Sequence, residues 1–227
     1  MADYYIELQN VVNTALKELE EEHRKGKLAN TPVSNTHFLV RWVTRSLKTQ
    51  RFPRCVGDDL TRWQKAGRSK GTASDLLFTF KNISAFYQSF FPIEKEPVAI
   101  TDADIETFLD RMEQDGWSVC TEYDLTEKTQ IFSEGDNSLV LCANQCVSCF
   151  LADEQGQESS QPEMLIKPIS MFVRGNHARF VQLATDAGFL VHKRTDYKSI
   201  VKYHGEYLIY PFNKGTQLAE IPIGFVK

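Results

Sequence analysis

Apolar residues in the first half of the chain recur at the spacing of an α-helix. In residues 4–24, Leu8, Val12, Ala15 and Leu19 fall on one face of such a helix. The same period, interrupted by glycine and proline signals, predicts further helices over 35–48, 58–66 and 73–90, with a loop over 67–71.

From Trp117 the pattern changes to the alternation of β-strands. A helix over 101–115 precedes this change, and a second helix over 175–187 ends at Gly188. His204 and Gly205 are predicted to form a tight hairpin turn. The predicted strands cover 117–123, 129–133, 138–150, 165–174, 189–195, 199–204 and 206–212.

These elements define an α+β fold, with a helical N-terminal half packed on a C-terminal half that holds a mixed, largely antiparallel sheet and two helices. Pro92 and Pro97 mark residues 92–100 as a linker. We therefore expect a basic helical domain over 1–91 and an α+β domain over 98–227.

The composition is that of an ordinary globular protein, with 42% hydrophobic and 25% charged residues. No apolar run approaches the roughly 20 residues of a membrane span, so no membrane association is expected. The first residues lack the features of a signal peptide, and the odd count of five cysteines argues against a disulfide framework. Both observations favour a cytoplasmic protein with reduced cysteines.

The net charge of −4 hides a strong segregation of charge along the chain. Residues 37–81 hold ten Lys/Arg and three acids, while residues 82–163 hold three Lys/Arg and seventeen acids. Residues 164–227 are basic again, with nine Lys/Arg and four acids. Such blocks are typical of proteins that bind polyanions, although the blocks could also neutralise one another in the fold.

The first basic block is the main candidate for nucleic-acid binding, because exposed cations that contact phosphates release counterions. Arg41, Arg45 and Lys48 follow the i, i+4, i+7 spacing of one helix face. Residues 58–80 fit a helix-turn-helix poorly, since Trp63 stands where a small residue is needed. The further candidates in this block are Arg51, Arg54, Arg62, Lys65, Arg68 and Lys70.

The stretch 193–207 is a second candidate, because cations alternate there with aromatic residues that could stack on bases. The tyrosines at strand spacing could equally be core. Asp196, His204 and Glu206 could instead form an acid–base group, although no nucleophile accompanies them at a recognisable spacing. The candidate cations of this stretch are Lys193, Arg194, Lys198 and Lys202.

Cys142, Cys146 and Cys149 form a C-x3-C-x2-C run, the spacing of some iron–sulfur sites. The run lies in a predicted strand, where buried cysteines behave as small apolar residues, so we expect neither a metal nor a cofactor. The phosphate-loop, dinucleotide-binding, nucleophile-elbow and zinc-protease motifs are absent from the sequence.

Three segments, 51–69, 170–175 and 193–207, resemble an uncharacterised family of gammaproteobacterial proteins over almost the whole chain. The resemblance implies a bacterial cytoplasmic origin and carries no catalytic assignment. The prediction is therefore a non-enzymatic protein that binds nucleic acid as a regulatory or accessory factor. The alternatives are a protein-interaction module with a bacterial partner, or an enzyme centred on the 193–207 hairpin.

Overall fold

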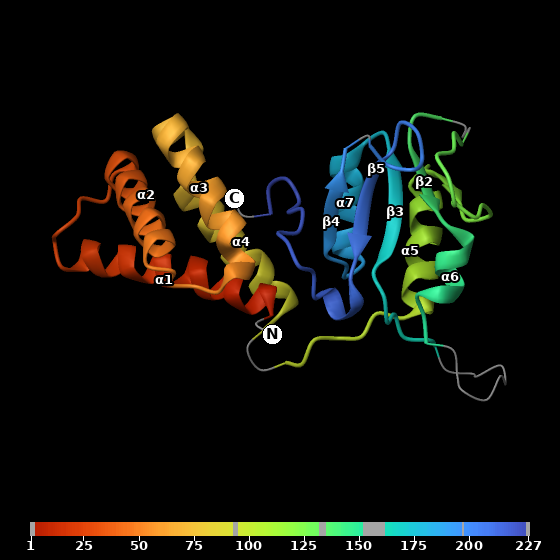
Figure 1. Cartoon of the computed structure of the whole chain (residues 1–227), viewed down its shortest axis with the longest axis horizontal. Helices are drawn as coiled ribbons and strands as arrows, with labels where there is room; N and C mark the ends of the chain where they lie inside the picture. The colour runs from red at the N-terminus through yellow and green to blue at the C-terminus, as the bar shows by residue number, and fades with distance from the viewer. Residues whose placement is uncertain (1–2, 93–94, 132–134, 152–161, 197, 226–227) are drawn as a thin grey trace. The chain divides into compact units, whose positions relative to one another are not determined.

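The computed structural model describes residues 3–92, 95–131, 135–151, 162–196 and 198–225. The chain forms two compact units. The first contains residues 1–95 together with 216–218 and 224–227, and the second contains residues 96–215 and 219–223. The fold is α+β, with the helical unit and the sheet-containing unit shown in Figure 1.

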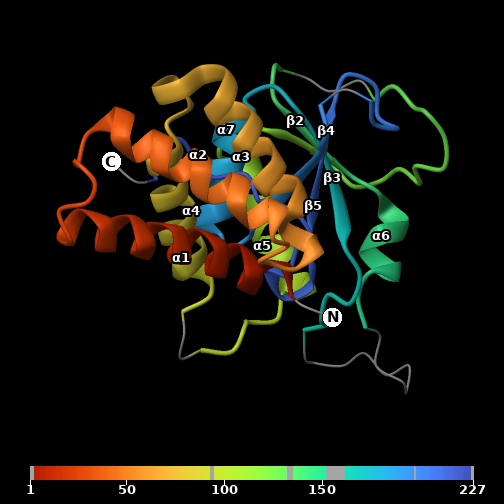
Figure 2. The same cartoon turned by 60° about the vertical axis from the view of Figure 1, so that its left-hand side comes forward.

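Four helices build the first unit: α1 (Tyr4–Arg24), α2 (Pro32–Lys48), α3 (Gly57–Lys70) and α4 (Leu76–Phe90). The predicted bounds of α1 are confirmed. The start of α2 is three residues earlier than predicted, because Thr31 caps it by accepting a hydrogen bond from the Ser34 amide, and Pro32 suits the first turn. Figure 2 shows α1 and α2 side by side, joined by a short loop.

The predicted loop over 67–71 is wrong, because α3 continues through Gly67 to Lys70. Gly67 is buried inside the helix, and a Cβ atom there would overlap the Cγ2 methyl of Val40 and lie 3.0 Å from Leu76 Cδ1. The glycine therefore serves the close approach of α3 to α2 and is not a break in the helix.

Replacing Gly67 with alanine is expected to destabilise the helical unit by about 1–2 kcal/mol in chemical denaturation. Overpacking against Val40, whose side chain is stiff in a helix, outweighs the helix propensity that alanine adds. The matched control is Gly57→Ala in the same helix, where nothing lies within 4 Å of the added Cβ. That variant is expected to be neutral or slightly stabilising, and an equal loss in both variants would contradict the packing argument.

The second unit contains a five-stranded sheet in the order β1-β2-β3-β5-β4. Of the four pairs between these described strands, β1–β2 is parallel and the other three are antiparallel, so the sheet is mixed and largely antiparallel, as predicted. The strands are β1 (Ser118–Cys120), β2 (Ser138–Leu141), β3 (Ile169–Arg174), β4 (Val191–Thr195) and β5 (Gly205–Ile209).

Helices α5 (Asp102–Gln114) and α7 (His177–Asp186) cover one face of this sheet (Figure 1). A capping box of Thr101 and Asp104 begins α5, and α7 ends before Gly188, whose φ of 88° allows the chain to turn. The main core lies beneath these helices, where Phe108 and Phe180 meet Tyr207 and the alternate residues of the strands.

The predicted strand over 138–150 is wrong after Leu141. After Cys142 the chain turns into a third described helix of this unit, α6 (Ala143–Ser148). The apolar pattern of these residues did not reveal that turn. Residues 129–131 contribute a single bridge, between Thr129 and Val201, and residues 132–133 lie outside the described residues.

The predicted turn at His204 and Gly205 is also wrong. Gly205 is the first residue of β5, and the β4–β5 connection runs over 196–204, with Tyr203 at a φ of 66°. The predicted strand over 199–204 is reduced to the bridge at Val201. Residues 206–209 form the strand, and Pro211 then begins a 3-10 turn (Pro211–Asn213).

None of the helices that the structure describes has the length and apolar character required to cross a bilayer.

Candidate functional site

The outward face of α2 carries the three cations that the sequence placed together. Arg41, Arg45 and Lys48 are all exposed, whereas Leu39 and Val43 on the opposite face are fully buried. No ion pair engages the three cations within the described part of the helical unit. This face therefore presents about two helical turns of unpaired positive charge to solvent.

A groove of about 430 Å³ follows the same face on the side of α3. Its lining includes Val40 and Thr44 of α2 and Arg68 of α3, which donates a long hydrogen bond of 3.4 Å to Thr44 Oγ1. Arg68 thereby joins the α2 cations in one cluster, which the sequence alone could not establish because α2 and α3 are separate helices. We call Arg41, Arg45, Lys48 and Arg68 the α2 cation cluster.

Two other cations of the first basic block are paired within the helical unit. Arg51 donates to Glu18 at 2.6 Å, and Arg62 pairs with the buried carboxylate of Asp59. Arg54, Lys65 and Lys70 are exposed, but none of the three lines the groove beside α2. The structure thus separates the block into the α2 cation cluster and scattered or paired charges elsewhere.

Hydrogen bonds between helices hold α2 in place behind this face. Trp42 donates its ring N–H to Glu18 of α1 at 2.7 Å, and the side chains of His23 and Asn35 are hydrogen-bonded at 2.8 Å. Burial would raise the pKa of Glu18, but the hydrogen bonds from Arg51 and Trp42 outweigh it and lower that pKa. Glu18 therefore stays ionised and anchors the two helices.

A buried pair fixes the start of α1 against α3. Tyr4 donates its hydroxyl to the Asp59 carboxylate at 2.6 Å, and both side chains are buried. Burial raises the pKa of both groups. This pair is structural, because it is shielded from solvent and lies in the core of the helical unit.

The cations of the 193–207 stretch are less available than the sequence suggested. Lys193 is half-buried and pairs with Asp196, and Arg194 donates to Glu206 at 3.0 Å. Lys198 and Lys202 are exposed. Of the tyrosines, Tyr207 is buried in the main core, as the core interpretation requires, whereas Tyr203 is 64% exposed.

The possible acid–base group of Asp196, His204 and Glu206 is not assembled. Asp196 is exposed beside Lys193, while Glu206 accepts a hydrogen bond from Ser170 at 3.0 Å. His204 is buried against Ser138. No hydrogen bond or ion pair joins any two of the three among the residues that the structure describes.

His204 instead belongs to a buried network that links β2 to the β4–β5 connection. Its Nδ1 lies 2.8 Å from the Lys202 carbonyl and must donate to it, so in the neutral ring Nε2 accepts from Ser138 Oγ at 2.7 Å. Arg174 donates to the same hydroxyl at 3.3 Å. Burial, with the nearby charge of Arg174, lowers the pKa of His204.

The stability of the protein is expected to fall as the pH decreases through 6.5, the ordinary pKa of histidine. In that range His204 binds a proton when the chain is unfolded. In the folded protein its lowered pKa keeps the ring neutral. The slope contributed by this residue is at most about 1.4 kcal/mol per pH unit.

The measurement is the free energy of unfolding at about pH 7.5 and about pH 5.5 for the wild type and His204→Gln. Because His177 is present in both proteins, the part of its lowered pKa that burial causes cancels in the comparison, and only the part due to the charge of His204 changes with the substitution. An equal pH dependence in the two proteins would show that His204 is not the responsible group.

The three clustered cysteines do not share one environment. Cys142 and Cys149 are buried, as the core interpretation predicts, but Cys146 is exposed on α6. Partial burial of its sulfur raises the pKa of Cys146, and burial raises that of Cys149, so both thiolates are less abundant. Within the described residues, no group of His, Cys, Asp or Glu has the arrangement of a metal site.

The fold and the site define an α+β protein whose helical unit carries a cluster of exposed cations. The family model described as "Protein of unknown function (DUF2913)" matches residues 3–222, so the chain belongs to that family. Neither the curated proteins nor the solved structures contain a match.

Proposed function

We propose that the protein binds nucleic acid through the α2 cation cluster, as a regulatory or accessory factor. The observation that carries this proposal is the outward face of α2, where Arg41, Arg45 and Lys48 are exposed without an ion pair in the described part of the helical unit. Arg68 extends the cluster across the groove. Unpaired guanidinium and ammonium groups in a row suit repeated phosphates, because each contact releases condensed counterions.

The geometry favours contact with the phosphate backbone over the reading of bases. Hydrogen bonds to α1 hold the helix that carries the cluster, and arginine binds phosphate oxygens in a bidentate manner. Phosphate contacts position a protein on nucleic acid and carry no sequence information. We therefore expect similar affinity for duplexes of different sequence.

The test is the affinity of the wild-type protein for a short mixed-sequence duplex over a range of salt concentrations. With four phosphate contacts, the logarithm of the association constant should fall with the logarithm of salt with a slope of about −3 to −4. Undetectable binding at low salt, or binding without salt dependence, would refute the proposal. A neutral polymer and a scrambled duplex serve as the controls for charge and sequence.

A further inference from the structure

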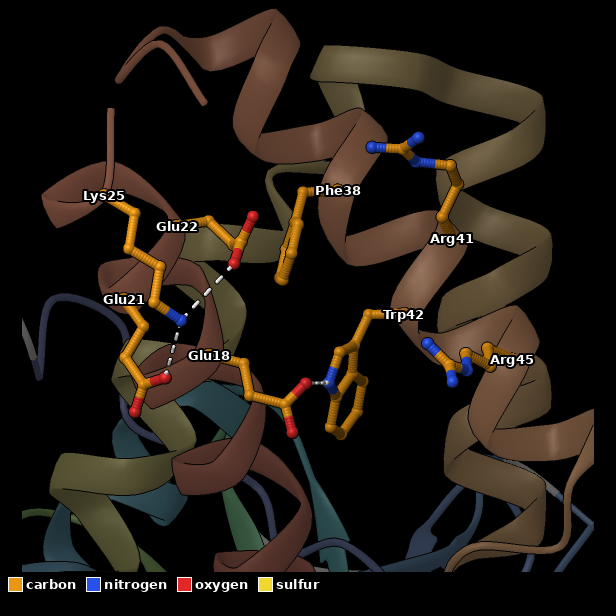
Figure 3. A pocket seen from close by; sticks show the side chains of 8 residues that line it. All are labelled: Glu18, Glu21, Glu22, Lys25, Phe38, Arg41, Trp42 and Arg45. Atoms are coloured by element: carbon orange, nitrogen blue, oxygen red, sulfur yellow. Dashed lines mark hydrogen bonds and ion pairs between the residues drawn. The ribbon is translucent and has the colours of Figure 1, made fainter. Parts of the chain in front are cut away.

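A second pocket lies on the other side of α2, between that helix and α1. Its volume is about 670 Å³. Figure 3 shows carboxylates and a lysine from α1 on one wall, two arginines of α2 on the other, and two aromatic rings between them. The lining residues are Glu18, Glu21, Glu22, Lys25, Phe38, Arg41, Trp42 and Arg45.

Two cations of the helical unit, Lys25 and Arg51, offset two of the three negative charges of the acidic wall. Lys25 lies 3.3 Å from Glu21 Oε2 and 3.7 Å from Glu22 Oε1. The third carboxylate, Glu18, accepts from Trp42 and Arg51. The wall consequently does not repel an anion as three free carboxylates would, yet its oxygens keep lone pairs that can accept further hydrogen bonds.

The opposite wall carries two guanidinium groups, of which Arg45 acts through its charge on Glu18 and helps to lower the pKa of that carboxylate. Arg41 and Arg45 are exposed, and neither makes a hydrogen bond or ion pair with its side chain in the part of the helical unit that the structure describes. Phe38, one helical turn before Trp42, is half-buried and presents its ring to the pocket. A ligand that satisfies these groups carries a phosphate for the arginines and a planar ring for Phe38.

We propose that this pocket binds an unstacked nucleotide, with its phosphate on Arg41 and Arg45 and its base against Phe38. Because the α1 wall offers acceptors at Glu21 and Glu22, the base must present a donor there. Among the pyrimidines, cytosine does so through its exocyclic amine, as adenine does among the purines, whereas uracil presents an oxygen acceptor at the ring position of the cytosine amine. The inference rests on the proposed function in that Arg41 and Arg45 belong to both surfaces.

The experiment is calorimetric titration of the full chain with CMP, UMP and cytidine. CMP is expected to bind at least about fivefold more tightly than UMP, the lower limit for one correct base contact. Cytidine, which lacks the phosphate, is expected to bind at least about tenfold more weakly than CMP. Equal binding of CMP and UMP, or no binding of either, overturns the proposal.

Variants locate the bound ligand. Phe38→Leu is expected to weaken CMP binding about fivefold or more through lost stacking, and Arg45→Gln weakens it through the phosphate. The matched control is Phe78→Leu, at a 42% exposed position of α4 that does not line the pocket. If Phe38→Leu and Arg45→Gln bind CMP as the wild type does, the ligand lies elsewhere and the proposal fails.

The source of the nucleotide is decided by a second comparison, of a cytosine-rich single strand with a blunt duplex. Stronger binding of the single strand, lost in Phe38→Leu, assigns the pocket to unstacked nucleotides within a strand. Tighter binding of CMP than of either polymer assigns it to the free nucleotide. Duplex binding without any CMP binding refutes the proposed nucleotide pocket and leaves the proposed function intact. CMP binding without duplex binding supports the pocket and refutes the proposed function.

Discussion

Reversing the charge of Arg41, Arg45 and Lys48 to glutamate is expected to lower affinity for duplex at least about 100-fold at low salt. The three residues supply most of the α2 cation cluster, and each replacement removes a phosphate contact and adds a repulsive charge. The salt slope should therefore decrease by about 3. Filter binding or fluorescence anisotropy across salt concentrations measures both quantities.

The matched control carries the same change of net charge at three exposed lysines elsewhere in the chain. Lys81, Lys128 and Lys167 are exposed and do not line the groove beside the α2 cation cluster. Glutamate at these three positions should leave the salt slope close to the wild-type value, apart from the effect of net charge on long-range attraction. If both triple variants lose affinity equally, binding follows total charge and the assignment to α2 is wrong.

Most helices were predictable from the sequence because burial of one face imposes a period that a single chain reveals. The bounds of α1 were correct, and Arg41, Arg45 and Lys48 do share an exposed face. Gly67 shows the limit of this reasoning. A glycine inside a helix looks like a break, and only the packing of α3 against Val40 of α2 explains it.

The strands were harder to place, because a short apolar run does not distinguish a strand from one turn of helix. Residues after Leu141 continue the apolar character of β2 but form α6. The turn at Gly205 was predicted from its composition, whereas the three-dimensional register pairs Gly205 with Val173 inside the sheet. Local turn preference was overridden here by the pairing of β3 with β5.

The candidate site was only partly predictable. The cations on α2 followed from their spacing, but Arg68 joined them through tertiary packing. The pocket between α1 and α2 was missed, because it combines acids and arginines from helices with different surface patterns. The signal available in the sequence was Trp42, which stands between Arg41 and Arg45. Its position indicates an aromatic ring at the edge of the cation face.

Replacing Phe180 with alanine is expected to cost about 3–5 kcal/mol of unfolding free energy. The ring is fully buried between α7 and the sheet, and its centroid lies 5.0 Å from that of Tyr207, 6.1 Å from Phe108 and 6.4 Å from Trp117. Removing it opens a cavity that helix α7 cannot close, because its neighbours are themselves large rings held by β5 and α5. Denaturant unfolding followed by circular dichroism measures the loss.

The control for this variant is Phe78→Ala, which removes the same ring from a 42% exposed position on α4. Because that ring already contacts water, its loss should cost less than about 1 kcal/mol. A domain is typically stable by only about 5–15 kcal/mol, so Phe180→Ala should bring the α+β unit close to its unfolding threshold. Similar losses in both variants would mean that the aromatic core beneath α7 does not dominate the stability of that unit.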